Sequence, residues 1–395
     1  MVWKDYQHLS TAGITPRIAA NMGNFRTVLA HGLDWNEPDL AETLYSIITF
    51  DSFCRISGKR SSGMLDLVPP YLEHLADHHL HSAYLTEFVV TGQYHTIPDP
   101  EAVERIAVEH CRLAGNVSGE ARFISALGTY YRQEKNNIPK ALECYETALA
   151  LGREVQNTQI QCTALRGIAE ANWQLGKYQE AQIRTREMRR LAQIHGLFFS
   201  EAQAIRVELL CRVSRGDLGS CLQLSAEGRK LLAFCGLQGS NVDLALLCSD
   251  AEVHFHKTEY TQARALYSTT YVDEAPVARG YDLMSIAHID LETGADPTKI
   301  RQDLEAVKST MESSRNPPGI MICEVFLAYV DIREGHLAKA RRSLEASFAQ
   351  TRGNDQEISI LCLNKLADGT CIVDLQSSFG WILVLLAFAL DGKNK

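Results

Sequence analysis

Histidines and acids gather in one short stretch, Glu73–His81 (EHLADHHLH), where metal chemistry is the first possibility to weigh. We expect a helix over residues 71–83, on which His74 and His78 share one face and could hold a divalent metal ion together with a carboxylate. The chain has no H-E-x-x-H arrangement, however, and no third ligand can be identified, so the ligand count of a metal site is not met. We therefore interpret the stretch as a solvated, histidine-rich helix face and expect no metal.

Two motifs that would indicate an enzyme are missing. The loop Ser57–Gly63 (SGKRSSG) contains the pair Gly58-Lys59, but Arg60 follows where a phosphate-binding loop needs Ser or Thr. No G-x-S-x-G nucleophile elbow occurs, and such an elbow needs a strand before its turn. We therefore expect no catalytic residues, no cofactor and no enzymatic activity.

Composition and charge limit the partners. The chain has 395 residues, 46% of them hydrophobic, and a net charge of -9. No run of Lys or Arg concentrates positive potential, so we expect no nucleic-acid partner. The length exceeds the ~250 to 300 residues at which one compact core stops growing, which predicts several domains or an elongated repeat array.

Cysteine usage and the N-terminus predict a cytoplasmic location. The 11 cysteines, which run from Cys54 to Cys371, show no paired C-x-x-C spacing of the kind that zinc sites use. They are typical of reduced, mostly buried small residues. The first residues (MVWKDYQHLSTAG) lack a basic stretch followed by an apolar core, so we expect no secretory signal and a reducing compartment.

An uncharged stretch near the C-terminus bears on membrane association. Leu375–Leu390 (LQSSFGWILVLLAFAL) spans 16 residues, fewer than the ~20 that a bilayer helix needs. We therefore expect no membrane contact and interpret the stretch as a helix of a repeat that the chain does not complete. Residues 381–388 would be apolar on nearly all sides, which predicts self-association through this helix.

A turn signature recurs along the chain: a small or polar residue, an apolar residue two places on, and a small residue five places on. Successive copies begin 40, 40, 42 and 77 residues apart, and the last gap, nearly two periods, holds a degenerate copy around Gly294. The repeat unit is therefore about 40 residues long. The copies are Asn136-x-Ile138-x-x-Ala141, Gly176-x-Tyr178-x-x-Ala181, Gly216-x-Leu218-x-x-Cys221, Thr258-x-Tyr260-x-x-Ala263 and Gly335-x-Leu337-x-x-Ala340.

Each part of the signature has a mechanical reason. Gly or Asn at the first position tolerates the left-handed conformation in which many helices end. The small residue five places on belongs where two helices cross closely, because a bulky side chain there would push them apart. Apolar residues at helical spacing flank the turn, such as Leu165, Ile168 and Trp173 before it and Met188 and Leu191 after it. Each repeat is thus predicted to be a helical hairpin.

The stretch Ala121–Arg153 (ARFISALGTYYRQEKNNIPKALECYETALALGR) resembles a tetratricopeptide repeat. The usual period of that repeat is 34 residues, so ~40 implies longer helices, similar to the superhelical variant in the sensor regions of MalT-type bacterial activators. The resemblance implies a right-handed superhelical solenoid of antiparallel helical hairpins. The residues that carry it are Leu127, Gly128, Tyr131, Ala141, Tyr145 and Ala148.

A further resemblance covers the N-terminal third. Ile18–Asp34 (IAANMGNFRTVLAHGLD) and Leu80–Tyr131 resemble the start of the helical-repeat region of fungal STAND-class proteins, in which an NB-ARC or NACHT module precedes the repeats. By this resemblance the chain is a sensor array without its NTPase module. A P-loop encoded in frame before Met1 would favour that alternative over a free-standing scaffold.

The first helix of each hairpin faces the concave surface in the tetratricopeptide family, and the family's exposed groove positions can be carried over by counting back from each turn. Arg166 and Arg206 are one period apart, so stacked repeats would place them on adjacent rungs, where they could hold a carboxylate or phosphate of a peptide. The alternative is that each arginine pairs with Glu170 or another acid across the groove. The candidate binding residues are Arg132, Arg166, Glu170, Arg206, Glu252, His256 and Arg333.

The sequence thus predicts an all-α protein of about seven to nine hairpins that binds a peptide or protein on its concave face. We expect residues 1–15 to be weakly ordered, residues 16–119 to form a helical region, and residues 120–395 to form the repeats, the last incomplete. The alternative function is the sensor or autoinhibitory arm of a STAND NTPase.

Overall fold

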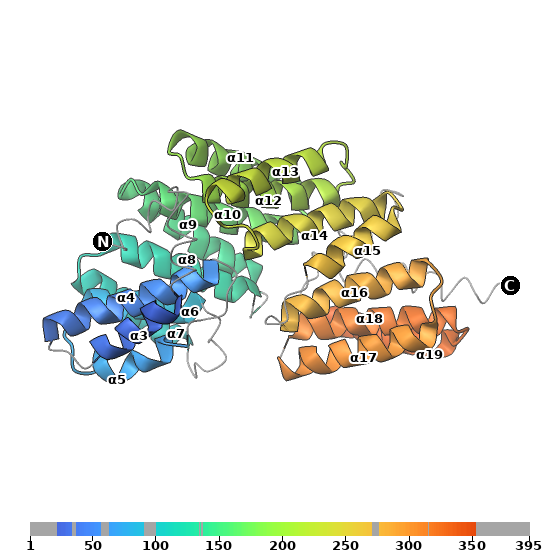
Figure 1. The fold of residues 1–395 in the computed structure, drawn as a ribbon, viewed down its shortest axis with the longest axis horizontal. Coiled ribbons are helices and arrows are strands. Elements are labelled where there is room, and N and C mark those ends of the chain that lie inside the picture. The colour runs from blue at the N-terminus through green and yellow to red at the C-terminus, as the bar shows by residue number, and fades with distance from the viewer. Residues whose placement is uncertain are drawn as a thin grey trace. The chain divides into compact units, whose positions relative to one another are not determined.

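A computed structural model of the chain describes residues 22–33, 37–56, 63–90, 100–133, 135, 137–270, 276–314 and 316–352. Within these ranges the chain forms helices joined by short turns and no strand. Figure 1 shows consecutive helices running back and forth beside one another. The predicted all-α solenoid of antiparallel helical hairpins is therefore confirmed.

The chain divides into two compact units, residues 1–211 with 223–246 and residues 212–222 with 247–395. Helices α12, α13 and α14 each contribute residues to both units. The helices before them are α3 (Met22–Gly32), α4 (Glu37–Ile56), η1 (Leu65–Leu67), α5 (Pro69–Leu72), α6 (His78–Val90), α7 (Pro100–Leu113), α8 (Val117–Gln133), α9 (Ile138–Glu154), α10 (Thr158–Gln174) and α11 (Tyr178–Ile194). The others are α12 (Phe198–Ser214), α13 (Cys221–Phe234), α14 (Asn241–His256), α15 (Tyr260–Thr269), α16 (Pro276–Glu292), α17 (Pro297–Ser313), α18 (Pro317–Arg333) and α19 (Leu337–Arg352).

A residue in the left-handed backbone conformation follows most of the repeat helices. After α10, Gly176 has φ 71°, its N–H donates to the Trp173 carbonyl at 2.9 Å, and the next N–H, of Lys177, donates to the Asn172 carbonyl at 2.9 Å. This pair of bonds satisfies carbonyls that the helix leaves unpaired. The same left-handed conformation recurs at Gln156, Gly196, Gly216, Gly236, Thr258, Gly294 and Gly335.

The first positions of the predicted turn signature therefore end helices as expected, at Gly176, Gly216, Thr258 and Gly335. Asn136 lies outside the described residues. The helices α8 to α12 are each 17 residues long, and short turns join them, so two helices and two turns give a period close to 40 residues. This length accounts for the departure from 34.

The small residues five places after each turn start are all buried, as predicted. They lie at the beginning of the second helix of each hairpin, against the helix before it. Ala181, for example, packs with Trp173 on α10 and Cys211 on α12. The fully buried members are Ala141, Ala181, Cys221, Ala263 and Ala340.

The N-terminal region corrects one expectation. Residues 71–83 do not form one helix, because α5 ends at Leu72 and α6 begins at His78. The Asp77 carboxylate caps α6 by accepting the N–H of Leu80 at 3.0 Å, which starts a new helix there. His74 therefore lies in the turn between two helices and does not share a helix face with His78.

Several predictions concern residues beyond the described ranges. Residues 1–15, the stretch Leu375–Leu390 and its apolar core 381–388 all lie there, and so do Cys362 and Cys371. Among the described helices, none has both the length and the apolar character needed to cross a membrane. The described cysteines, from Cys54 to Cys323, are free thiols, and burial raises the pKa of several, such as Cys162 to about 12.

The buried small residues give a first prediction. Replacing Ala181, Ala263 or Ala340 with Leu should overpack a helix crossing and lower the free energy of unfolding by ~1 to 3 kcal/mol. Thermal unfolding of the three variants measures this, with exposed Ala265→Leu on α15 as the matched control. Unchanged melting of all three would show that the small residue of the signature has no packing role.

Candidate ligand-binding site

Four of the predicted groove residues come together on three helices of the first unit. The Glu170 carboxylate of α10 lies between two arginines from the neighbouring helices. Its Oε2 accepts from Arg132 Nη2 of α8 at 2.7 Å, and its Oε1 accepts from Arg206 Nη2 of α12. Both the Arg132 and Glu170 side chains are only 10% exposed, so the bridge lies largely out of solvent.

The electrostatics of Glu170 follow from this placement. Burial acts to raise the pKa of the Glu170 carboxyl, but Arg132, Arg206 and Arg166 outweigh it and lower the pKa to about 2. Glu170 is therefore ionised at neutral pH. A buried carboxylate with a hydrogen-bonded arginine on each oxygen is a strong link between helices.

Arg166 is different from the other two arginines. It lies one turn before Glu170 on α10, and its guanidinium forms no hydrogen bond or ion pair with a described residue. Its Nε is buried without a partner, and the residue as a whole is half-buried. Burial lowers the pKa of Arg166, and the positive charges of Arg206 and Arg132 add to this against the pull of Glu170.

The sequence left two interpretations of the arginines open, and the geometry divides them. Arg132 and Arg206 pair with Glu170, which is the ion-pair interpretation. Arg166 does not. Three guanidinium groups thus surround one carboxylate, and the cluster, which we call the arginine site (Arg132, Arg166, Glu170, Arg206), has a surplus of positive charge.

Tyr145 of α9 supports the arginine site from the core. Its ring is 1% exposed and packs where α8 and α10 carry glycine. A Cβ on Gly128 or on Gly167 would come within 2.8 Å or 2.3 Å of the ring. The Tyr145 hydroxyl donates to Thr129 Oγ1 at 3.1 Å and accepts from Arg132 Nε at 3.4 Å. The sequence marked Tyr145 as a repeat position but not as part of the site.

The other three candidates belong to the second unit. Arg333 of α18 donates to the Leu291 carbonyl at 2.9 Å near the end of α16, so it serves as a helix cap there. His256 of α14 is half-buried, and burial followed by the charge of His288 lowers its pKa. Glu252, also on α14, lies near enough to act on the Tyr267 hydroxyl. Their role in binding stays a prediction.

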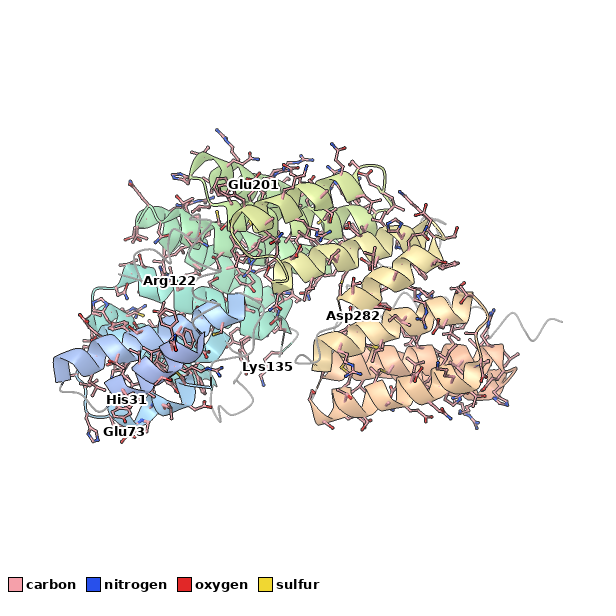
Figure 2. All side chains as sticks on the ribbon, in the orientation of Figure 1. His31, Glu73, Arg122, Lys135, Glu201 and Asp282 are labelled. Carbon is pink, nitrogen blue, oxygen red and sulfur yellow. The ribbon has the colours of Figure 1, made fainter. Side chains whose placement is uncertain are left out.

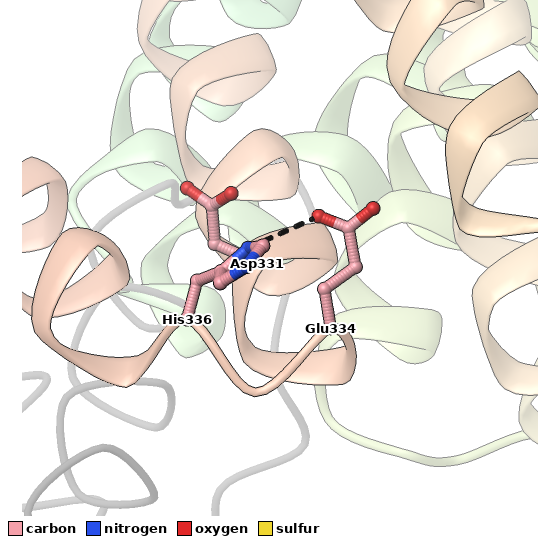
Figure 3. A group of neighbouring side chains, drawn as sticks. All are labelled: Asp331, Glu334 and His336. Carbon is pink, nitrogen blue, oxygen red and sulfur yellow. Dashed lines mark ion pairs between the residues drawn. The ribbon is translucent and has the colours of Figure 1, made fainter.

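Sequence reasoning missed an acidic cluster at the turn between α18 and α19 (Figure 3). Asp331, Glu334 and His336 bring one ligand atom each to within 4.8 Å of one another. Arg301 pairs with Asp331 at 2.6 Å and with Glu334 at 2.5 Å, and Lys339 pairs with Asp331 at 3.0 Å. The two carboxylates are thus already matched by two cations, and the cluster is an ion-pair network that ties α17 to α18 and α19.

A second histidine contact was also missed, because its partner is remote in sequence. His78 Nδ1 lies 2.9 Å from Nδ1 of His110 on α7, and the His81 ring stacks on His110 at 4.5 Å. For these two Nδ1 atoms to form a hydrogen bond, one must carry a proton and donate it, and the other must accept it. Burial, then His81 and His78, lower the pKa of His110. The histidines of α6 thus serve helix packing.

Comparison with solved structures supports the fold. No protein-family model matches the sequence, and no curated protein does. The chain is similar to a Rap protein complexed with Competence and Sporulation Factor, with a TM-score of 0.54 and 11% identity over 89% of this chain and 98% of that one. It is also similar to the Rap conjugation gene regulator of the plasmid pLS20 in complex with the Phr* peptide, with a TM-score of 0.50 and 14% identity over 96% and 95%. The chain is therefore an all-α helical repeat protein.

A buried acid in the second unit has a raised pKa. Asp282 of α16, labelled in Figure 2, lies with Thr270 Oγ1 at 3.0 Å and Cys248 Sγ at 3.5 Å. The Thr270 hydroxyl also lies 2.9 Å from the Tyr267 carbonyl, which can only accept. The Thr270 hydroxyl has one proton, so it can donate to only one of these two acceptors at a time. Burial raises the pKa of Asp282 and outweighs the hydrogen bonds from Thr270 and Cys248, which lower it.

The glycines beneath Tyr145 give a second prediction. Gly167→Ala should force the buried ring of Tyr145 aside and lower the free energy of unfolding by ~1 to 3 kcal/mol. Gly23→Ala is the control, since Gly23 is also helical but has open space, and Ala favours a helix over Gly by ~1 kcal/mol. Chemical denaturation measures both. Equal effects of the two substitutions would remove the packing role of Gly167.

Asp282 gives a third prediction, with its sign set by the raised pKa. An acid whose pKa is higher in the folded state stabilises the fold fully below its unfolded pKa, and this contribution is lost as pH rises through the folded pKa. Asp282→Asn keeps a donor for Thr270 and an acceptor for Cys248, so it should melt like the native protein near pH 4 and at higher temperature at pH 7. A lower melting temperature at pH 7 would mean that the ionised carboxylate is the stabilising form.

Proposed function

We propose that this chain is a non-catalytic helical repeat protein that binds a peptide, or an extended segment of a protein, on the face formed by α8, α10 and α12. The observation that carries the proposal is the arginine site. Three arginines surround one carboxylate there, which leaves positive charge unmatched among largely buried side chains. Buried charge without a counter-charge is costly, which favours a site that receives an anion from outside.

The structural neighbours support the same class of ligand. Two solved Rap structures with this fold are complexes, one with a peptide and one with Competence and Sporulation Factor. A solenoid exposes one helix of every hairpin along a continuous surface, which suits an extended chain better than a small molecule. The cytoplasmic location and the STAND-class sensor alternative stay predictions of the sequence, and no observation in the structure favours the latter.

The test is a screen of a random peptide library against the full chain, followed by hydrogen exchange with an enriched peptide. We expect enrichment of peptides and protection of backbone amides in α8, α10 and α12. Arg206→Ala should weaken the binding of an enriched peptide about tenfold, the usual effect of losing ~1.4 kcal/mol.

Arg184→Ala is the matched control, because Arg184 lies in the same unit but on α11, where it pairs with Glu146 at 2.9 Å. It should leave affinity unchanged. Failure to enrich any peptide, or protection confined to other helices, would refute the proposed function.

A further inference from the structure

The partners within the arginine site are unequal, and this inequality indicates what the site accepts. Glu170 offers two oxygens, and Arg132 and Arg206 take one each. Arg132 is also engaged through Nε by the Tyr145 hydroxyl. The guanidinium left without a partner is Arg166, on the same helix as Glu170 and one turn away.

The part of Arg166 that has no partner has a defined shape. Its Nε is buried, and its two terminal nitrogens form no hydrogen bond or ion pair with a described residue. Terminal nitrogens of one guanidinium present parallel N–H groups, which match the two oxygens of a carboxylate in a bidentate contact. The site therefore offers the guanidinium of Arg166 to a ligand. Beside it, the ion pairs of Glu170 with Arg132 and Arg206 are already formed.

The negative charge of Glu170 decides which kind of anion can bind the Arg166 guanidinium most favourably. A phosphate dianion would bring a third oxygen and a second negative charge close to the ionised Glu170, whose two arginines are already engaged. A carboxylate brings one negative charge and uses both of its oxygens on Arg166. The geometry favours the carboxylate.

We propose that Arg166 is the anchor for a carboxylate of the bound peptide and that Glu170 holds Arg132 and Arg206 as the positively charged wall beside it. This inference rests on the proposed function and names the ligand group that the site recognises. The carboxylate can come from the peptide C-terminus or from an Asp or Glu side chain.

Glu170 has a predicted effect of opposite sign, which separates binding from structure. Glu170→Gln removes the negative charge that repels the incoming carboxylate and frees Arg132 and Arg206 to attract it. Affinity for an acidic peptide should then rise, whereas a purely structural role of Glu170 would make it fall. Circular dichroism and thermal unfolding check that each variant folds.

The experiment uses random hexapeptide pools in four forms: with a free C-terminal acid or a C-terminal amide, and with or without Asp and Glu. Binding to the full chain is measured by equilibrium dialysis. We expect at least a tenfold preference for the pools that contain a carboxylate, and the acid and amide arms identify its source.

Arg166→Gln should abolish this preference, Arg166→Lys should retain part of it through the charge alone, and Arg184→Gln should leave it intact. Inorganic phosphate at the same ionic strength as chloride should not compete more strongly than chloride. If peptides bind but the pools that contain a carboxylate bind no better than the amide pool without Asp and Glu, or Arg166→Gln keeps the preference, the carboxylate anchor is wrong while the proposed function stands. If no pool binds, the proposed function itself fails. Preferential competition by phosphate would assign the site to phosphoryl groups.

Discussion

The packing of Tyr145 between two glycines is the contact on which the first unit depends most. The ring comes from α9 and fills the space that Gly128 on α8 and Gly167 on α10 leave open. Its hydroxyl emerges beside Thr129 and Arg132, so one side chain belongs both to the core and to the arginine site. The position of Arg132, and through it that of Glu170, is thus coupled to how closely α8 and α10 approach.

Helix length then decides which side chains can meet. Because α8 to α12 have the same length and end in short turns, alternate helices return to the same place in the repeat. An ion pair such as Glu170 to Arg206 bridges residues 36 apart in sequence, and that from Glu170 to Arg132 bridges residues 38 apart. A shorter helix in this stretch would rotate one of these partners away from the shared face.

Two polar clusters of the chain show how charge balance separates a structural network from a binding site. Around Asp331 and Glu334, the cations of Arg301 and Lys339 match the carboxylates, and each cation is paired with a carboxylate of the same cluster. In the arginine site the cations outnumber the carboxylate, and Arg166 has no acid of its own. The charges of the acidic cluster are therefore accounted for by ion pairs between helices. The surplus positive charge of the arginine site is best explained by a ligand.

The sequence by itself determined the features that are local in the chain. The repeat length, the left-handed helix ends at Gly176 and Gly216 and the buried small residues such as Ala181 all follow from backbone conformation and residue size within one hairpin. Lack of a P-loop or nucleophile elbow was equally readable, because those motifs are contiguous. The break before His78 was missed, since the capping bond from Asp77 competes with a continuous helical pattern.

Only the tertiary structure decided which arginines are paired. The period placed Arg166 and Arg206 on adjacent rungs, but it could not say that Glu170 would satisfy Arg132 and Arg206 and leave Arg166 without a partner. Likewise, His78 meets His110 and Asp282 meets Cys248, and each of these partners comes from a helix distant in sequence. Side-chain pairing depends on rotamers and on small differences in the distance between helices. A pattern of residue types along one chain does not encode these directly.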